Sequence, residues 1–193
     1  VLGFSAGTLF ADVLAQITRK SGRKLTGETR WQPASRVYVV TTQEGAEIKV
    51  SPRDVADIRV QAPSNMKRAA QLAQDGKCSQ AIPLLQKIVN DYTMLQWDAV
   101  AGKYLVNCYM ETGDAKQAAS VGNKIVRSNP KAAYQADFAP PYWEALVETE
   151  QFAKLRDMLE KAAELGDREL AAVAQVRRGD MLRKREKYEE ALV

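Results

Sequence analysis

The 193-residue sequence contains no histidine and only two cysteines. Without histidine the common Ser-His and Cys-His catalytic arrangements cannot form, because each needs an imidazole as general base. Two cysteines without histidine cannot supply the four ligands of a structural zinc site. The Gly-Lys pairs at Gly76 and Gly102 lack the preceding glycine of a phosphate-binding P-loop. We therefore expect no cofactor, no metal site and no enzymatic activity from this chain.

Long apolar runs and strong charge bias are also missing. Hydrophobic residues make up 46% of the chain and the net charge is +4. This composition suffices for a buried core and fits one or two domains. No stretch approaches the ~20 apolar residues of a membrane span. The mild positive charge is not typical of a protein specialised for nucleic acids.

The first eleven residues, Val1–Ala11, are uncharged and apolar, and Asp12 follows at once. They resemble the end of a secretory signal peptide, with Ala11 as the last residue removed. No cysteine follows, so a lipid anchor is not expected there. We predict export, to a bacterial periplasm or cell envelope. The alternative is an apolar strand or helix of the fold, and the protein would then be cytoplasmic.

Residues 12–62 show the short alternating patterns of β-strands. The expected strands lie near 13–17, 25–30, 37–42, 46–50 and 58–60. Glu44 and Gly45 indicate a hairpin turn, and Ser51–Asp54 indicates one helical turn with an early proline. Five short strands with a helical turn before the last resemble a small SH3-like barrel.

This β-rich region is mildly basic, with nine Lys or Arg against six acids. Arg19, Lys20, Arg23 and Lys24 gather at one predicted turn, and Trp31 follows. An SH3-like or Sm-like barrel that binds nucleic acid is therefore the alternative function. No aromatic platform alternates with the charges, which favours an ordinary solvated hairpin.

From residue 65 to the end the pattern becomes helical, and Gly102–Pro130 shows it best. Two apolar stripes at helical spacing predict two helices. The stripes are Leu105, Val106 and Tyr109, then Ala118, Gly122, Ile125 and Val126. Gly113 and Asp114 lie between them; glycine tolerates positive φ and aspartate caps the next helix. The small residues in the second stripe allow a neighbouring helix to approach closely.

Glycine-led turns and small residues recur along this part of the chain at a nearly fixed interval. Gly113 follows Gly76 by 37 residues, and Ala118 follows Ala81 by 37. Leu155 follows Ala118 by 37, and Ala191 follows Leu155 by 36. A period of this length in helical sequence predicts a solenoid of stacked helix pairs. The expected class is thus α+β: a small β-barrel-like domain, then an all-α solenoid over 65–193.

The helix pair resembles a tetratricopeptide repeat. Leu105, Tyr109, Gly113, Ala118 and Pro130 stand where that family places Leu, Tyr, Gly, Ala and a closing Pro. Two positions differ from the family's pattern: Val106 replaces the usual glycine, and Gly122 replaces the usual aromatic residue. Similar copies begin near residues 69, 140 and 177, about 3.5 repeats in all. In the last copy, KYEEAL (187–192) resembles the start of a second helix. Sel1-like repeats are the main alternative, because the sequence LEKAAELGD (159–167) resembles the end of their second helix.

The resemblance implies a concave groove that is lined by the first helices and binds a protein or peptide. The exposed face of the first helix in Gly102–Pro130 carries Lys103, Asn107 and Glu111, at i, i+4 and i+8. Lys103 and Asn107 resemble part of the family's clamp for a peptide carboxylate, and Arg183 adds positive charge. We therefore predict an exported, non-enzymatic interaction scaffold. The alternative for these residues is a generic polar helix face.

The two cysteines occupy related places in the predicted repeats. Cys78 begins one second helix, and Cys108 lies near the end of the next first helix. Adjacent helices of a solenoid run antiparallel, so the two residues lie at the same level. A disulfide is therefore allowed in an oxidising compartment. Two separate, buried free thiols are the alternative.

Overall fold

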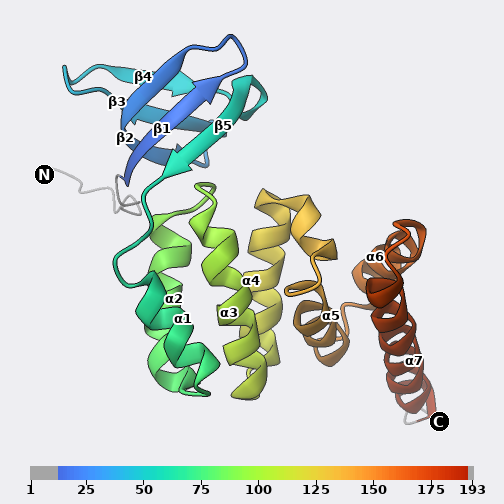
Figure 1. The fold of residues 1–193 in the computed structure, drawn as a ribbon. Helices are drawn as coiled ribbons and strands as arrows, with labels where there is room; N and C mark the ends of the chain where they lie inside the picture. The colour runs from blue at the N-terminus through green and yellow to red at the C-terminus, as the bar shows by residue number, and fades with distance from the viewer. Residues whose placement is uncertain (1–12, 191–193) are drawn as a thin grey trace, which may run out of the picture. The chain divides into compact units, whose positions relative to one another are not determined.

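A computed structural model describes residues 13–190, which divide into two compact units (Figure 1). The β unit comprises the described residues up to Met66 together with Lys87–Asp98, and the helical unit comprises Lys67–Gln86 and the residues from Ala99 onward. Strands come first and helices follow, which confirms the predicted α+β class. The predicted signal-peptide remnant, residues 1–11, lies outside the described residues.

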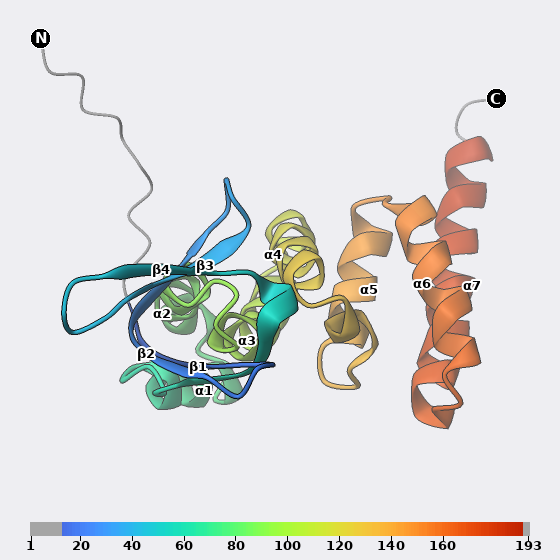
Figure 2. The ribbon, with the colours of Figure 1, turned by 90° about the horizontal axis from the view of Figure 1, so that it is seen from above.

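The β unit contains one five-stranded antiparallel sheet, strongly curved in the view from above (Figure 2). Its elements are β1 (Val13–Arg19), β2 (Lys24–Gln32), β3 (Val37–Thr41), β4 (Glu47–Val50), the 3₁₀ turn η1 (Pro52–Asp54) and β5 (Val55–Val60). The strand order is β4-β3-β2-β1-β5. The five predicted strands and the helical turn before the last are thus all present.

Alternation along the strands explains why one face of this sheet is buried. Ile17 of β1 pairs with Leu25 of β2 and with Ile58 of β5. Ile17 is completely buried, whereas Leu14 on the other face of β1 is 59% exposed. Successive side chains of a strand point to opposite faces, so one apolar set forms the core.

A segment from outside the strands completes the core of the β unit. Leu95 is completely buried and packs in one cluster with Ile17, Tyr38 and other core residues. The Tyr38 hydroxyl donates a hydrogen bond to the carbonyl oxygen of Met94 (3.1 Å). The indole Nε1 of Trp97 donates to the carbonyl oxygen of Val60 (3.3 Å). The compact unit therefore includes residues far beyond the last strand.

The helices succeed one another with short connections. They are α1 (Met66–Gln74), α2 (Cys78–Asp91), α3 (Trp97–Glu111), α4 (Ala115–Ser128), α5 (Ala139–Glu148), α6 (Phe152–Glu164) and α7 (Arg168–Glu190), with the 3₁₀ segment η2 (Pro130–Tyr134) after α4. The Asp114 side chain accepts a hydrogen bond from the Gln117 amide and caps α4, as predicted. Within residues 13–190, no helix combines the length and hydrophobicity that crossing a membrane would require.

Small residues in the helical unit do allow close helix packing. A Cβ added at Gly122 of α4 would lie 2.1 Å from the ring of Tyr142 in α5. A Cβ added at Gly102 of α3 would lie 2.7 Å from the side chain of Ile125 in α4. Both distances are too short for a carbon contact, so a side chain at either position would force the neighbouring side chain to move.

The C-terminal helix differs from the predicted pattern. The KYEEAL sequence predicts the start of a second helix, which requires a turn before Lys187. Instead, α7 runs without interruption from Arg168 to Glu190. Residues 181–190, MLRKREKYEE, contain no glycine or proline, and Leu, Met, Arg, Lys and Glu are strong helix formers. Nothing local therefore ends the helix.

Candidate functional site

Helices α5 and α7 form a strongly charged cleft in the helical unit. Helix α5 starts at Ala139, with Pro140 and Pro141 in its first turn, where their missing amide protons cost nothing. Helix α7 contacts both α5 and α6. Its residues Ala174 and Met181 are buried at these contacts. The packing leaves a row of charged side chains of α7 beside α5.

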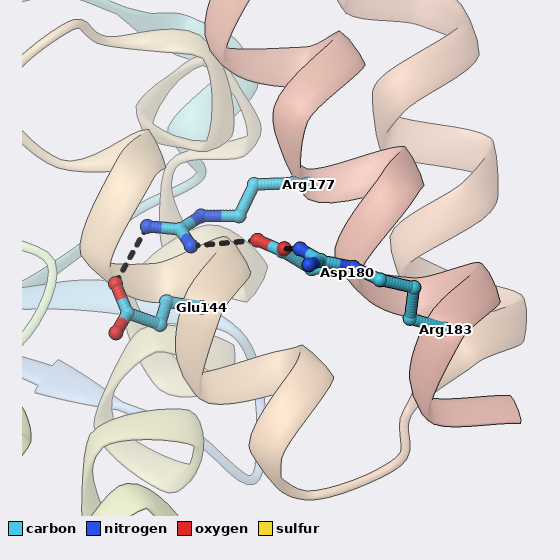
Figure 3. A network of polar contacts seen from close by, with 4 residues as sticks. All are labelled: Glu144, Arg177, Asp180 and Arg183. Carbon is cyan, nitrogen blue, oxygen red and sulfur yellow. Dashed lines mark hydrogen bonds and ion pairs between the residues drawn. The ribbon is translucent and has the colours of Figure 1, made fainter. Parts of the chain in front are cut away.

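Arg177 of α7 connects the two helices (Figure 3). Its Nη2 lies 2.6 Å from Oε2 of Glu144 on α5, and its Nη1 lies 3.0 Å from Oδ2 of Asp180 one turn further along α7. The other oxygen of Asp180 accepts from Arg183. Figure 3 shows this chain of alternating charges running from Glu144 through Arg177 and Asp180 to Arg183. Each charge in the chain is thereby paired with its opposite.

A second bridge lies one turn beyond the first. Nζ of Lys184 is 2.8 Å from Oε2 of Glu148 and also donates to the Glu148 carbonyl oxygen (3.3 Å). Glu144 and Glu148 are four residues apart, and Arg177 and Lys184 are seven apart. Both spacings place side chains on one face of a helix. The two helices therefore present matched rows of acids and bases to each other.

These side chains line an open cleft of about 510 Å³. The lining residues are Glu144, Val147, Glu148, Arg177, Asp180, Arg183 and Lys184. Three acids and three bases balance one another, and Val147 supplies the single apolar wall. The Nε of Arg177 is buried and has no hydrogen-bond partner among the described residues. Such a cleft offers charged hydrogen-bond donors and acceptors to a polar ligand.

The three predicted binding residues on α3 lie elsewhere. Nζ of Lys103 is 2.6 Å from Oδ2 of Asp137, and the hydrogen bond to that carboxylate raises the pKa of Lys103. The side-chain amide of Asn107 donates to the Lys103 carbonyl oxygen (3.0 Å). Oε2 of Glu111 accepts from the Cys78 thiol (3.2 Å). The polar groups of all three are thus engaged within the chain.

Of the predicted site residues, Arg183 lines the α5–α7 cleft, whereas Lys103, Asn107 and Glu111 do not. Sequence reasoning missed the central roles of Arg177 and Asp180. The 37-residue period does locate the acidic row, because the residues one period after Asn107 and Glu111 are Glu144 and Glu148. Nothing comparable marked Arg177, because its partner lies 33 residues earlier on another helix.

Both cysteines are free and buried. Burial raises the pKa of the Cys78 thiol, and the hydrogen bonds to Cys108 and Glu111 raise it further. Burial also raises the pKa of Cys108. Both groups therefore remain protonated thiols with low nucleophilicity near neutral pH, and the predicted disulfide stays a prediction.

Among the described residues, no group of three or more Cys, Asp or Glu side chains is placed to hold a metal ion. Comparison with protein-family models and with curated proteins finds no match for this chain. The charged cleft and the packing of the helices are therefore the basis for assigning a function.

Proposed function

We propose that this chain is a non-enzymatic protein-interaction scaffold whose helices from residue 65 onward form a tetratricopeptide-like solenoid. Three helix pairs, α1–α2, α3–α4 and α5–α6, are each joined by a short turn. Equivalent turn residues such as Gly76 and Gly113 are 37 residues apart. Both features support stacked repeats. A Sel1-like solenoid would show the same helix pairs and is the rival within this class.

The observation that carries the proposal is the charged cleft between α5 and α7. In a solenoid of helix pairs these two would be the first helices of consecutive repeats, which line the concave face. Arg183 is 75% exposed, so most of its donors are accessible to a partner. The acidic row on α5 and the basic row on α7 fit a peptide whose charges alternate in sign, because complementary potentials fix orientation and register.

Binding to this cleft can be tested with peptides selected against the purified chain from a random displayed library. We expect the selected peptides to lose about 5- to 150-fold in affinity on Arg183→Ala or Lys184→Ala, equivalent to about 1–3 kcal/mol. Fluorescence anisotropy measures this change. The matched control is Arg178→Ala, an exposed arginine of α7 that lies outside the cleft.

A failed selection, or affinities that respond equally to the control and to the cleft variants, would reject the α5–α7 site. Lys103→Ala and Asn107→Ala test the α3 face in the same assay. Lys103 and Arg183 are both already paired within the chain, but the side chain of Lys103 is 29% exposed whereas that of Arg183 is 75% exposed. We therefore expect smaller losses at α3 than at Arg183.

We further propose that the scaffold is exported and that the β unit is a second docking module of SH3-like type. The support for export is the apolar sequence Val1–Ala11 before Asp12. The strand order and the 3₁₀ turn before β5 support the SH3-like assignment. Processing of the full-length precursor, read by N-terminal sequencing of secreted protein, tests cleavage after Ala11.

A nucleic-acid-binding β unit is the second candidate, and one observation favours it. The hairpin between β1 and β2 exposes Lys20, Arg23 and Lys24 together at its tip. Oligonucleotide binding at low salt that falls about tenfold or more on reversing two of these charges would support it. Arg19, next to them, is already paired with Asp54 at 3.6 Å. Absence of binding at 50 mM salt rejects this candidate.

A further inference from the structure

Asn123 of α4 lies at the centre of a polar network that joins three helices. Its Oδ1 accepts hydrogen bonds from the hydroxyl of Tyr142 on α5 (2.8 Å) and from Nζ of Lys154 on α6. Its Nδ2 donates to Oε1 of Gln151, the residue that precedes α6 (3.1 Å). The amide of Asn123 is thus held from both sides, and it fixes the Lys154 ammonium beside α4.

A second cation lies next to the Lys154 ammonium. Arg127 follows Asn123 by four residues on α4, and side chains at this spacing are neighbours on one helix face, with Cβ atoms about 5–6 Å apart. Burial lowers the pKa of Lys154, and the positive charge of Arg127 lowers it further. Lys103 shows the contrast, because its hydrogen bond to Asp137 raises its pKa. Arg127 and Lys154 are therefore two neighbouring like charges, which we call the α4–α6 cation pair.

No acid neutralises the α4–α6 cation pair in the part of the chain that the structure describes. Lys154 has the oxygen of Asn123 as its hydrogen-bond partner there, and Arg127 makes no ion pair with a carboxylate. The first turn of α6 contains no acid. Asp157 follows Lys154 by three residues, but its Oδ1 lies 3.6 Å from Nη2 of Arg156. The positive charge of the pair is thus left uncompensated.

Three effects make this arrangement unfavourable without an anion. Two neighbouring cations repel each other, and partial burial disfavours the charged form of an ammonium group. Lys154 is also the third residue of α6, where the partial positive charge of the helix N-terminus disfavours a cation. A bound anion would relieve all three effects, so the pair is suited to binding one.

We propose that Arg127 and Lys154 bind a phosphate group. A phosphate monoester carries a charge of about −1.5 to −2 at pH 7, which matches two cations better than the single charge of a carboxylate does. The Arg127 guanidinium can donate two parallel N–H groups to two phosphate oxygens. An ammonium group has three donors, so Lys154 retains donors beyond the one that Asn123 uses. Both side chains are exposed, which leaves them open to free phosphate and to a phosphorylated protein.

The α4–α6 cation pair is separate from the α5–α7 cleft, because neither of its residues lines that cleft. The proposal therefore does not depend on peptide binding in the cleft, and each can fail alone. Contacts to two exposed cations are weak, since solvent and salt screen them. We expect a dissociation constant of about 1–10 mM for inorganic phosphate.

NMR titration of the isotope-labelled chain with inorganic phosphate tests the proposal, at constant ionic strength and above the second pKa of phosphate. We expect saturable shifts of the Asn123, Arg127 and Lys154 signals, and a rise in the Lys154 pKa because an anion favours the charged ammonium. The dissociation constant should increase about fivefold or more in Arg127→Gln and in Lys154→Gln. The matched control is Lys116→Gln, which removes an exposed positive charge near the start of α4 and should not change binding.

Two further ligands identify the chemistry and its source. Acetate carries a single charge and should give no saturable shifts at these residues. If N-acetyl-phosphoserine amide binds at least as tightly as inorganic phosphate, the site takes phosphorylated proteins; if it binds more weakly or not at all, the site takes free phosphate.

The adjacency of the two cations has its own test in the same spectra. Without phosphate, Arg127→Gln should raise the Lys154 pKa, because it removes a neighbouring positive charge. An unchanged pKa in this variant overturns the proposal. So do a lack of saturable shifts with both phosphate ligands, equal binding of acetate, and equal dissociation constants in the control and in the Arg127 and Lys154 variants.

Discussion

Leu95 offers the sharpest test of how the β unit is held together. It lies between α2 and α3, yet it is completely buried in the core formed by the strands. The flanking residues Met94 and Gln96 both have left-handed backbone conformations, with φ of 64° and 71°. This conformation costs residues other than glycine roughly 1–2 kcal/mol each. The burial of Leu95 must offset that cost for the loop to persist.

The magnitude of the Leu95→Ala effect follows from burial. Removing three carbons from a fully buried leucine and leaving a cavity costs about 2–5 kcal/mol. Relief of the backbone strain in this loop would reduce the loss of stability. Weakening of the Tyr38–Met94 hydrogen bond would increase it. The Met94 amide also donates to Oδ2 of the buried Asp98 at 2.7 Å, which keeps the loop anchored from its other end. We therefore expect a loss within this range.

Native-state hydrogen exchange measures the loss where it occurs. A destabilisation of 2 kcal/mol speeds exchange of the β1–β3 amides about 30-fold, since 1.4 kcal/mol is a factor of ten. Leu14→Ala is the control, because Leu14 lies in the same unit and is 59% exposed. Its effect should stay within about 0.5 kcal/mol. If Leu95→Ala changes strand exchange no more than Leu14→Ala does, Leu95 is not part of the core.

Two other predictions follow from packing. Gly122→Ala should lower the free energy of unfolding by about 1–3 kcal/mol, because the added Cβ overlaps the Tyr142 ring. Gly179→Ala should raise the free energy of unfolding by about 0.5–1 kcal/mol, because an added Cβ there meets nothing within 4 Å. Urea unfolding compares the two variants, and equal effects would contradict the packing. Cys78 and Cys108 should react with Ellman's reagent at least tenfold more slowly in the native than in the unfolded protein. A rapid native reaction would contradict their burial, and no thiols after unfolding without reductant would show the disulfide.

Local signals explain which parts of the fold were predictable. Val37–Thr41 is rich in β-branched residues and pairs with strands close to it in sequence. Gly113 and Asp114 end one helix and cap the next through contacts within a few residues. Such patterns depend on backbone preference and on the period of apolar residues. They therefore do not depend on contacts with distant parts of the chain.

Leu95 and Arg177 were not predictable, because their roles depend on distant partners. Leu95 lies in the sequence DYTMLQWD between two helices, and no local pattern there assigns it to the core of the strands. Its burial depends on a core formed more than thirty residues earlier. Arg177 is one of several arginines on α7, and only the packing of α7 against α5 selects it as the partner of Glu144. The same limit applies to Lys103, whose partner Asp137 follows it by 34 residues.

Gly122, one of the two departures from the proposed repeat pattern, is a point of close packing between helices. Gly122 stands where the resembling family places an aromatic residue, and the structure fills that space with the ring of Tyr142. Tyr142 follows Leu105 by 37 residues, so it occupies the equivalent place on the next first helix. Cores tolerate such exchanges when total volume is conserved. If the chain is the tetratricopeptide-like array that we propose, the Tyr142 ring takes the volume of the aromatic residue that the pattern would place at residue 122.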